Sequence, residues 1–191
     1  MNRRQFLYGT AAVTMPILSS GCDRDRPAVS IDDSYPVGRF GETSTAEEVT
    51  LGLDLTGMTA IVTGCNSGLG LETMRVLALR GAHVIGTGRT LEKASKACSV
   101  MPGKTTPVAL ELSSLQSVIE CADTIARLDI PIDILVCNAG INTFGELVEL
   151  VNGVEKTFVV NYLGHFVLVN RLMPLMNQAQ ESRIVHVGSM S

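Results

Sequence analysis

A length of 191 residues, of which 46% are hydrophobic, is enough for one globular domain with an appended segment. The net charge of -4 and the 4% aromatic content argue against nucleic acid as a partner, because such binding depends on clustered cations and on rings that stack with bases. The five cysteines form no C-x-x-C pair, so the sequence indicates neither a metal site nor a disulfide framework. Most of them are expected to be small core residues.

The first 22 residues have the features of an export signal. Arg3 and Arg4 precede an uncharged run over 6–21, which is too short for a membrane span of about 20 apolar residues. The run ends at Cys22 and resembles the signal of a bacterial lipoprotein, in which that cysteine is acylated. We therefore expect residues 1–22 to direct twin-arginine export and to attach the protein to a membrane by a lipid. A first helix retained by a cytoplasmic protein is the alternative.

Residues 23–50 are polar and lack a sustained apolar period, so we expect a linker there and a folded domain over 51–191. The β-branched run 60–63 predicts the first strand, which ends at a glycine-rich turn before a helix over 69–80. Such a turn can hold the diphosphate of a dinucleotide, because a helix start offers unpaired N–H groups and a positive dipole. Turn chemistry alone is the alternative. The expected cofactor contacts in the turn are Gly64, Asn66, Ser67, Gly68, Leu69 and Gly70.

Strands and helices alternate along the rest of the chain. Helices are predicted over 91–100, 115–125 and 153–176, and further strands over 82–89, 106–112, 132–137 and 183–187. Strands that are almost continuously apolar and alternate with helices indicate an α/β fold, in which helices cover both faces of a parallel sheet.

Four motifs, in this order, resemble the short-chain dehydrogenase/reductases. They are the turn at 63–70, Cys-Asn-Ala-Gly at 137–140, Asn161, and Ile-Val-His-Val-Gly-Ser at 184–189. Within that family, the segments 111–115 and 160–166 are similar to the branch of the retinol dehydrogenases and protochlorophyllide reductases. The resemblance implies a Rossmann-like doubly wound sheet and NAD(P)-dependent carbonyl reduction or alcohol oxidation on a small molecule. It also implies a homo-oligomer for the full-length form.

The sequence predicts NADP rather than NAD as the cofactor. About 20 residues after the turn, a dinucleotide fold places an acidic residue against the ribose of NAD or an Arg near the 2′-phosphate of NADP. This sequence has Arg89 there, and a guanidinium can grip a phosphate through two hydrogen bonds. A solvated arginine at a strand end is the alternative. The resemblance assigns further contacts with the adenine and the ribose to Glu111, Leu112, Asn138, Ala139 and Gly140.

The resemblance also assigns catalytic roles. Ser189 would hydrogen-bond the reacting oxygen, and Asn161 would support a proton-relay water; a structural amide is the alternative for Asn161. The family's Tyr-x-x-x-Lys pair should follow the serine, but the sequence ends at Ser191 without it, and Phe166 stands four residues after Tyr162. We therefore expect an oxidoreductase fragment that ends after the fifth strand and is inactive alone. A nucleotide-binding or interaction protein without catalysis is the alternative.

Overall fold

A computed structural model describes residues 38–142 and 148–188 of the chain. Apart from the first two, these residues belong to one compact unit, Phe40–Ser191. The predicted signal, residues 1–22, and the predicted catalytic Ser189 lie outside the described residues, so export, acylation and the role of Ser189 stay predictions. In the described ranges, no helix is both long and apolar enough to cross a membrane.

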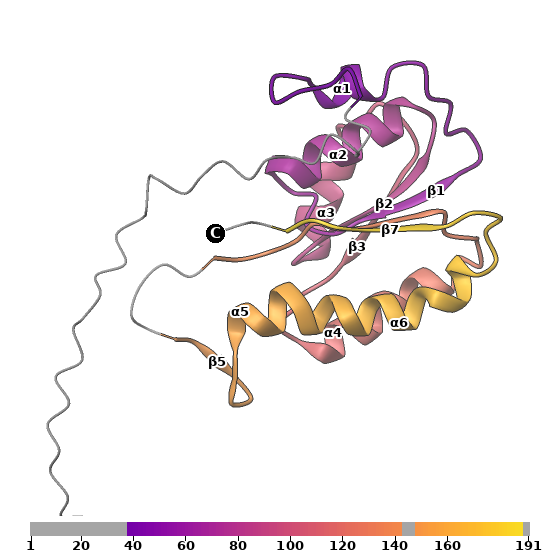
Figure 1. Cartoon of the computed structure of the whole chain (residues 1–191). Helices are drawn as coiled ribbons and strands as arrows, with labels where there is room; N and C mark the ends of the chain where they lie inside the picture. Colours follow the sequence, from indigo (N-terminus) through magenta and orange to yellow (C-terminus); the bar gives the residue numbers. More distant parts are fainter. Residues whose placement is uncertain (1–37, 143–147, 189–191) are drawn as a thin grey trace, which may run out of the picture. The chain divides into compact units, whose positions relative to one another are not determined.

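Five parallel strands form the main sheet of this unit (Figure 1). Their order is β3-β2-β1-β4-β7, and every neighbouring pair is parallel. The chain moves outward from β1 through β2 and β3, then returns to add β4 and β7 on the other side of β1. The predicted α/β fold with a parallel sheet is confirmed. The strands are β1 Thr59–Val62, β2 His83–Gly88, β3 Thr105–Ala109, β4 Ile134–Cys137 and β7 Arg183–His186.

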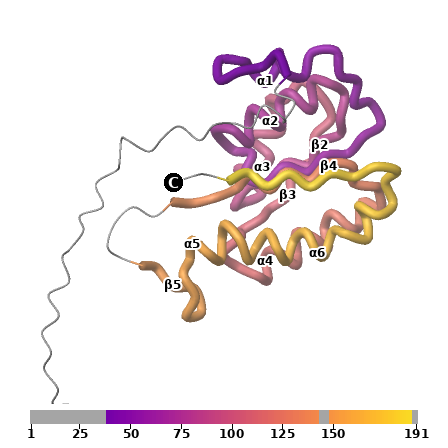
Figure 2. The backbone as a smooth tube through the Cα atoms, viewed as in Figure 1, coloured from indigo at the N-terminus to yellow at the C-terminus, as the bar shows by residue number. Residues whose placement is uncertain are grey.

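Helices cover both faces of the sheet, as the tube in Figure 2 also shows. Successive side chains of a strand point to opposite faces, so β1 contributes to two cores. Ala60 and Val62 pack in a cluster with side chains of α2 and α3, whereas Ile61 packs in a cluster with α4 and α6. The predicted layering is therefore confirmed. The helices are α2 Gly68–Leu79, α3 Leu91–Cys98, α4 Leu115–Ala126 and α6 Gly164–Met176.

The helix predicted over 153–176 begins later than expected. Strand β5, Leu150–Val151, pairs antiparallel with β6, Val154–Glu155. Asn152 and Gly153 join the two strands with φ values of 52° and 80°. An Asn-Gly pair with both φ values positive is the favoured two-residue hairpin turn, so this local signal prevails over the helical period. The prediction was wrong for residues 153–155.

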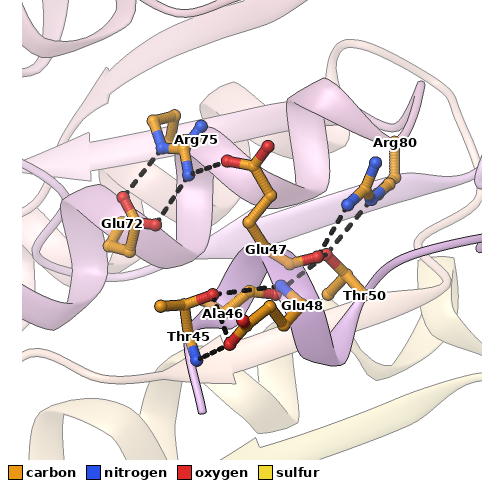
Figure 3. A network of polar contacts seen from close by, with 8 residues as sticks. All are labelled: Thr45, Ala46, Glu47, Glu48, Thr50, Glu72, Arg75 and Arg80. Carbon is orange, nitrogen blue, oxygen red and sulfur yellow. Dashed lines mark hydrogen bonds and ion pairs between the residues drawn. The ribbon is translucent and has the colours of Figure 1, made fainter. Parts of the chain in front are cut away.

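The end of the predicted linker, 23–50, is a short helix, α1, Ala46–Val49 (Figure 3). Its first turn has a capping box: the Glu48 N–H donates to the Thr45 hydroxyl at 3.2 Å, and the Thr45 N–H donates to the Glu48 carboxylate at 2.8 Å. The Glu47 carboxylate accepts a hydrogen bond from the Arg75 guanidinium on α2 at 2.9 Å. The segment from Phe40 therefore belongs to the compact unit, and the linker prediction was too long at this end.

Replacing Arg80 by alanine should loosen α1. The Arg80 guanidinium donates to the Glu47 carbonyl at 2.8 Å and to the Thr50 hydroxyl at 3.1 Å (Figure 3). We expect Arg80→Ala to lower the free energy of unfolding by about 1 kcal/mol and to speed hydrogen exchange at the Thr50 amide. The control is Arg127→Ala, because the Arg127 guanidinium bonds Thr124 in its own helix. Unchanged exchange in Arg80→Ala would contradict this account of α1.

Candidate functional site

A cavity of about 670 Å³ lies at the carboxyl ends of four neighbouring strands. Gly64 and Gly70 line it after β1, Arg89 after β2, Glu111 after β3 and Asn138 after β4. The order of the strands reverses beside β1, and open parallel sheets bind their ligands at the carboxyl edge of such a reversal. The cavity is therefore the candidate site of this fold.

The structure brings together the predicted cofactor contacts, although they come from four separate parts of the sequence. Gly68 does not line the cavity, but both of its neighbours do. The predicted residues that line the cavity are Gly64, Asn66, Ser67, Leu69, Gly70, Arg89, Glu111, Leu112, Asn138, Ala139 and Gly140.

The glycine turn packs closely against the loop that follows β4. Gly64 and Gly68 have φ values of 71° and 57°, in the left-handed region that favours glycine. A Cβ added to Gly64 would lie 2.9 Å from the Cβ of Ala139. A Cβ added to Gly70 would overlap the Gly64 carbonyl oxygen and the side-chain amide of Asn138. Two of the three glycines are thus required by contact with neighbouring atoms.

The N-terminus of α2 provides a site for an anion. Ser67 is the N-cap residue, its backbone is extended, and its side chain makes no capping hydrogen bond. The first N–H groups of a helix lack partners inside the helix and carry partial positive charge. Because Ser67 and Gly70 both line the cavity, this end of a 12-residue helix can receive the oxygens of a diphosphate.

Within the described lining of the cavity, the Arg89 side chain is left for a ligand. The Glu111 carboxylate accepts hydrogen bonds from the Ser113 N–H at 3.0 Å and from the Ser113 hydroxyl at 2.8 Å. Lys156 forms an ion pair with Glu149 at 2.6 Å. Among the charged side chains in the described lining, the exposed Arg89 has neither an ion pair nor a hydrogen bond. Its guanidinium can therefore bind a phosphate without breaking another contact.

Thr63 ties the loop after β4 to the end of β1. The buried Thr63 hydroxyl accepts from the backbone N–H groups of Asn138 and Ala139, each at 2.9 Å. The Asn138 side chain donates in turn to the Thr63 carbonyl oxygen at 2.8 Å. The Nε2 atom of His165 on α6 also lies 2.9 Å from the Thr63 hydroxyl. These bonds fix the loop in the position that closes one side of the cavity.

Asn161 lies in a π-helical turn, η1 Val159–Leu163, which follows α5 Lys156–Phe158 and leads into α6. Its side-chain oxygen accepts from the Ile141 N–H at 2.8 Å, and its side-chain nitrogen donates to the Ile141 carbonyl at 2.8 Å. Both ends of the amide are thus used to hold the backbone next to Gly140. These contacts fit the alternative of a structural amide, and a role in proton relay stays a prediction.

A second cavity, of about 990 Å³, adjoins the first and shares Leu69 and residues 138–142 with it. Tyr162 lines it, and its ring stacks on that of Phe166 at a centroid distance of 6.2 Å. Cys137 also lines this cavity, but burial raises the pKa of its thiol to about 11. The Cys137 thiol is therefore protonated at neutral pH and is not a nucleophile. Within residues 38–142 and 148–188, no three His, Cys, Asp or Glu side chains are grouped to hold a metal ion.

Comparisons with known proteins identify the family. A family model described as short chain dehydrogenase matches residues 58–191. The WW domain-containing oxidoreductase of Pongo abelii is 40% identical over 176 residues, which are 87% of this chain and 42% of that protein. Retinol dehydrogenase 13 of Mus musculus is 37% identical over 140 residues, which are 71% of this chain and 42% of that protein. This chain thus spans about two fifths of the length of these curated relatives.

A solved structure agrees with these relatives. The crystal structure of a metagenomic short-chain oxidoreductase in complex with NADP superposes with a TM-score of 0.64 at 26% identity. The superposition covers 71% of this chain and 64% of that one. Together with the predicted retinol-dehydrogenase-like motifs and the glycine turn at the cavity, the family match is decisive. The chain belongs to the short-chain dehydrogenase/reductase family.

Proposed function

We propose that this chain is the NADP-binding part of a short-chain oxidoreductase that interconverts a carbonyl and an alcohol on a small molecule. The observation that carries the proposal is the arrangement of the first cavity. An open helix N-terminus, the glycine turn and Arg89, which has no ion pair or side-chain hydrogen bond among the described residues, all border the same space. A bound NADP(H) would supply or accept the hydride of the reaction.

Different residues of the cavity bind different parts of the nucleotide. The start of α2 binds the diphosphate, and Arg89 binds the 2′-phosphate. The buried Leu112 offers an apolar contact to the adenine, beside Glu111. Asn138, whose side chain joins the loop after β4 to β1, and its small neighbours Ala139 and Gly140 let the ribose approach the backbone closely. The second cavity, which is mostly apolar, receives the substrate beside the nicotinamide.

We expect the 191-residue chain to bind the nucleotide without turning it over. The sequence has no Tyr-x-x-x-Lys pair, and general acid–base catalysis typically contributes about 10²- to 10⁴-fold. Both ends of the Asn161 side-chain amide are hydrogen-bonded to the backbone of Ile141. The role proposed for Ser189 is only to hydrogen-bond the reacting oxygen.

A titration of the full chain with NADPH and with NADH, followed by nucleotide fluorescence, tests the proposal. NADPH should bind at least about tenfold more tightly, because a charge-assisted phosphate contact is added. A panel of aldehydes and ketones should cause no oxidation of the bound NADPH. Equal affinities would contradict the NADP preference, measurable oxidation would contradict the expected inactivity, and a lack of saturable binding would contradict the nucleotide site.

A further inference from the structure

His165 and Thr63 form a buried polar contact between α6 and the end of β1. The two residues are 3% and 0% exposed, and 2.9 Å separates the His165 Nε2 atom from the Thr63 hydroxyl. The same hydroxyl accepts the N–H groups of Asn138 and Ala139. One hydroxyl group therefore connects a histidine with the loop that borders the nucleotide cavity.

The number of protons at this contact fixes the tautomer of the histidine. A hydroxyl has two lone pairs and one proton, and the N–H groups of Asn138 and Ala139 occupy both lone pairs of Thr63. The proton must be donated, and the His165 Nε2 at 2.9 Å is a nearer acceptor than the Val136 carbonyl at 3.4 Å. Nε2 is thus unprotonated. The ring proton is on Nδ1, which faces the Asn161 carbonyl at 3.4 Å.

The surroundings of His165 keep the ring neutral. Burial lowers its pKa below the ordinary value, the hydrogen bond to the Asn161 carbonyl acts in the opposite direction, and His186 on β7 lowers the pKa further. Cys137, which is protonated at neutral pH, and Tyr162 line the same cavity. The described lining of that cavity contains no Asp, Glu, Lys or Arg that could stabilise an imidazolium.

We propose that neutral His165 is a positioning residue for the nucleotide site. By accepting the Thr63 proton, it leaves both lone pairs of that hydroxyl for the loop, which fixes Asn138 and Ala139 against the glycine turn. Protonation of His165 at Nε2 places an N–H group opposite the Thr63 hydroxyl, whose two lone pairs are already occupied. The N–H group of Asn138 or that of Ala139 must then lose its hydrogen bond to this hydroxyl. The effect on nucleotide affinity rests on the proposed function, whereas the tautomer and the loop contacts do not.

The first test needs no nucleotide. Two-dimensional ¹H–¹⁵N spectra of the unmodified chain should show His165 with an unprotonated Nε2 and a protonated Nδ1 near neutral pH. The hydrogen-exchange protection of the Ala139 amide should fall about tenfold as His165 is protonated. An Nε2-protonated tautomer, or protection of Ala139 that does not change when His165 titrates, would overturn the inference.

Variants separate positioning from packing. His165→Gln keeps an acceptor near the Thr63 hydroxyl but cannot titrate, so it should retain the protection of Ala139 at every pH. His165→Leu should lower that protection about tenfold at every pH. The control is His83→Gln, because the His83 Nε2 lies 2.8 Å from the Thr106 hydroxyl in a similar pair between β2 and β3. His83→Gln should show the same protection of the Ala139 amide as the parent protein at each pH. If His165→Gln protects this amide as weakly as His165→Leu does, the positioning role is contradicted.

The binding test uses NADP⁺ and the same variants. The 2′-phosphate of NADP⁺ itself titrates near pH 6. The informative quantity is therefore the ratio of the parent affinity to that of His165→Gln, followed from neutral pH to lower pH. This ratio should fall about tenfold as His165 is protonated. A constant ratio with saturable binding would contradict the inference. Failure of the parent to bind NADP⁺ would contradict the proposed function, and the exchange experiment would still decide the role of His165.

Discussion

Replacing Arg89 by alanine should weaken NADPH binding by about 10- to 100-fold and change NADH binding by less than about twofold. The expected loss of affinity corresponds to the loss of charge-assisted hydrogen bonds to a phosphate. Only NADPH carries a phosphate at this position. The exposed Arg89 has no hydrogen bond or ion pair within the described residues. Its removal therefore leaves no group unpaired, and the free energy of unfolding should change by less than about 0.5 kcal/mol.

Titration of the parent protein and of each arginine variant with NADPH and with NADH measures this selectivity. Arg127→Ala is the matched control, because it removes an exposed arginine that does not line the cavity and bonds Thr124 on α4. It should leave both affinities unchanged. Arg89→Asp should favour NADH, because a carboxylate accepts from a ribose 2′-hydroxyl and repels a phosphate. Equal losses for the two nucleotides in Arg89→Ala would remove the basis for the NADP preference.

Gly70→Ala should destabilise the protein by about 2 kcal/mol, although helix propensity alone predicts a gain of about 1 kcal/mol. The added Cβ would overlap the Gly64 carbonyl oxygen and the Asn138 side-chain amide. A backbone carbonyl inside a packed turn cannot move aside cheaply, and overpacking of this kind costs about 3 kcal/mol. The turn must shift away from Asn138 to relieve the overlap, so NADPH affinity should fall with stability.

Gly68→Ala separates crowding from backbone strain. Gly68 has a φ of 57°, but a Cβ added there meets no atom within 4 Å. Gly68→Ala should therefore lower the free energy of unfolding only by the cost of holding an alanine in the left-handed region, about 1–2 kcal/mol. Urea unfolding of the parent and of both variants gives the comparison. A Gly70→Ala protein that is more stable than the parent would show that the turn does not pack against Asn138 in solution.

The sequence was sufficient to predict the elements that carry strong local patterns. The β-branched run of β1, the glycines after it and the alternation of strands with helices predicted the sheet and the place of the cavity. Two local signals were present but overlooked. The Asn152-Gly153 pair is a hairpin turn, and the Thr45-x-x-Glu48 pattern is a capping box. A helix of four residues is nevertheless not stable alone, and α1 depends on the contacts that Arg80 makes with it.

The polar contacts that shape the site were beyond sequence reasoning. Thr63 and His165 are 102 residues apart, and nothing in either neighbourhood indicates that the two side chains meet. The bonds between Asn161 and Ile141 depend on a π-helical turn, for which residues 159–163 show no distinctive pattern. A polar residue within an apolar stretch was the available signal for both, and it indicates only that the side chain needs a partner.

An NMR titration of the ¹⁵N-labelled chain with NADPH tests nucleotide binding in this cavity most directly. Saturable shifts are predicted at the amides of Gly64, Gly70, Arg89 and Ala139, which line the cavity from three sides, and the amide of Thr124 on α4 should stay unchanged. A titration without saturable shifts, or with shifts only away from these residues, would contradict binding in the cavity.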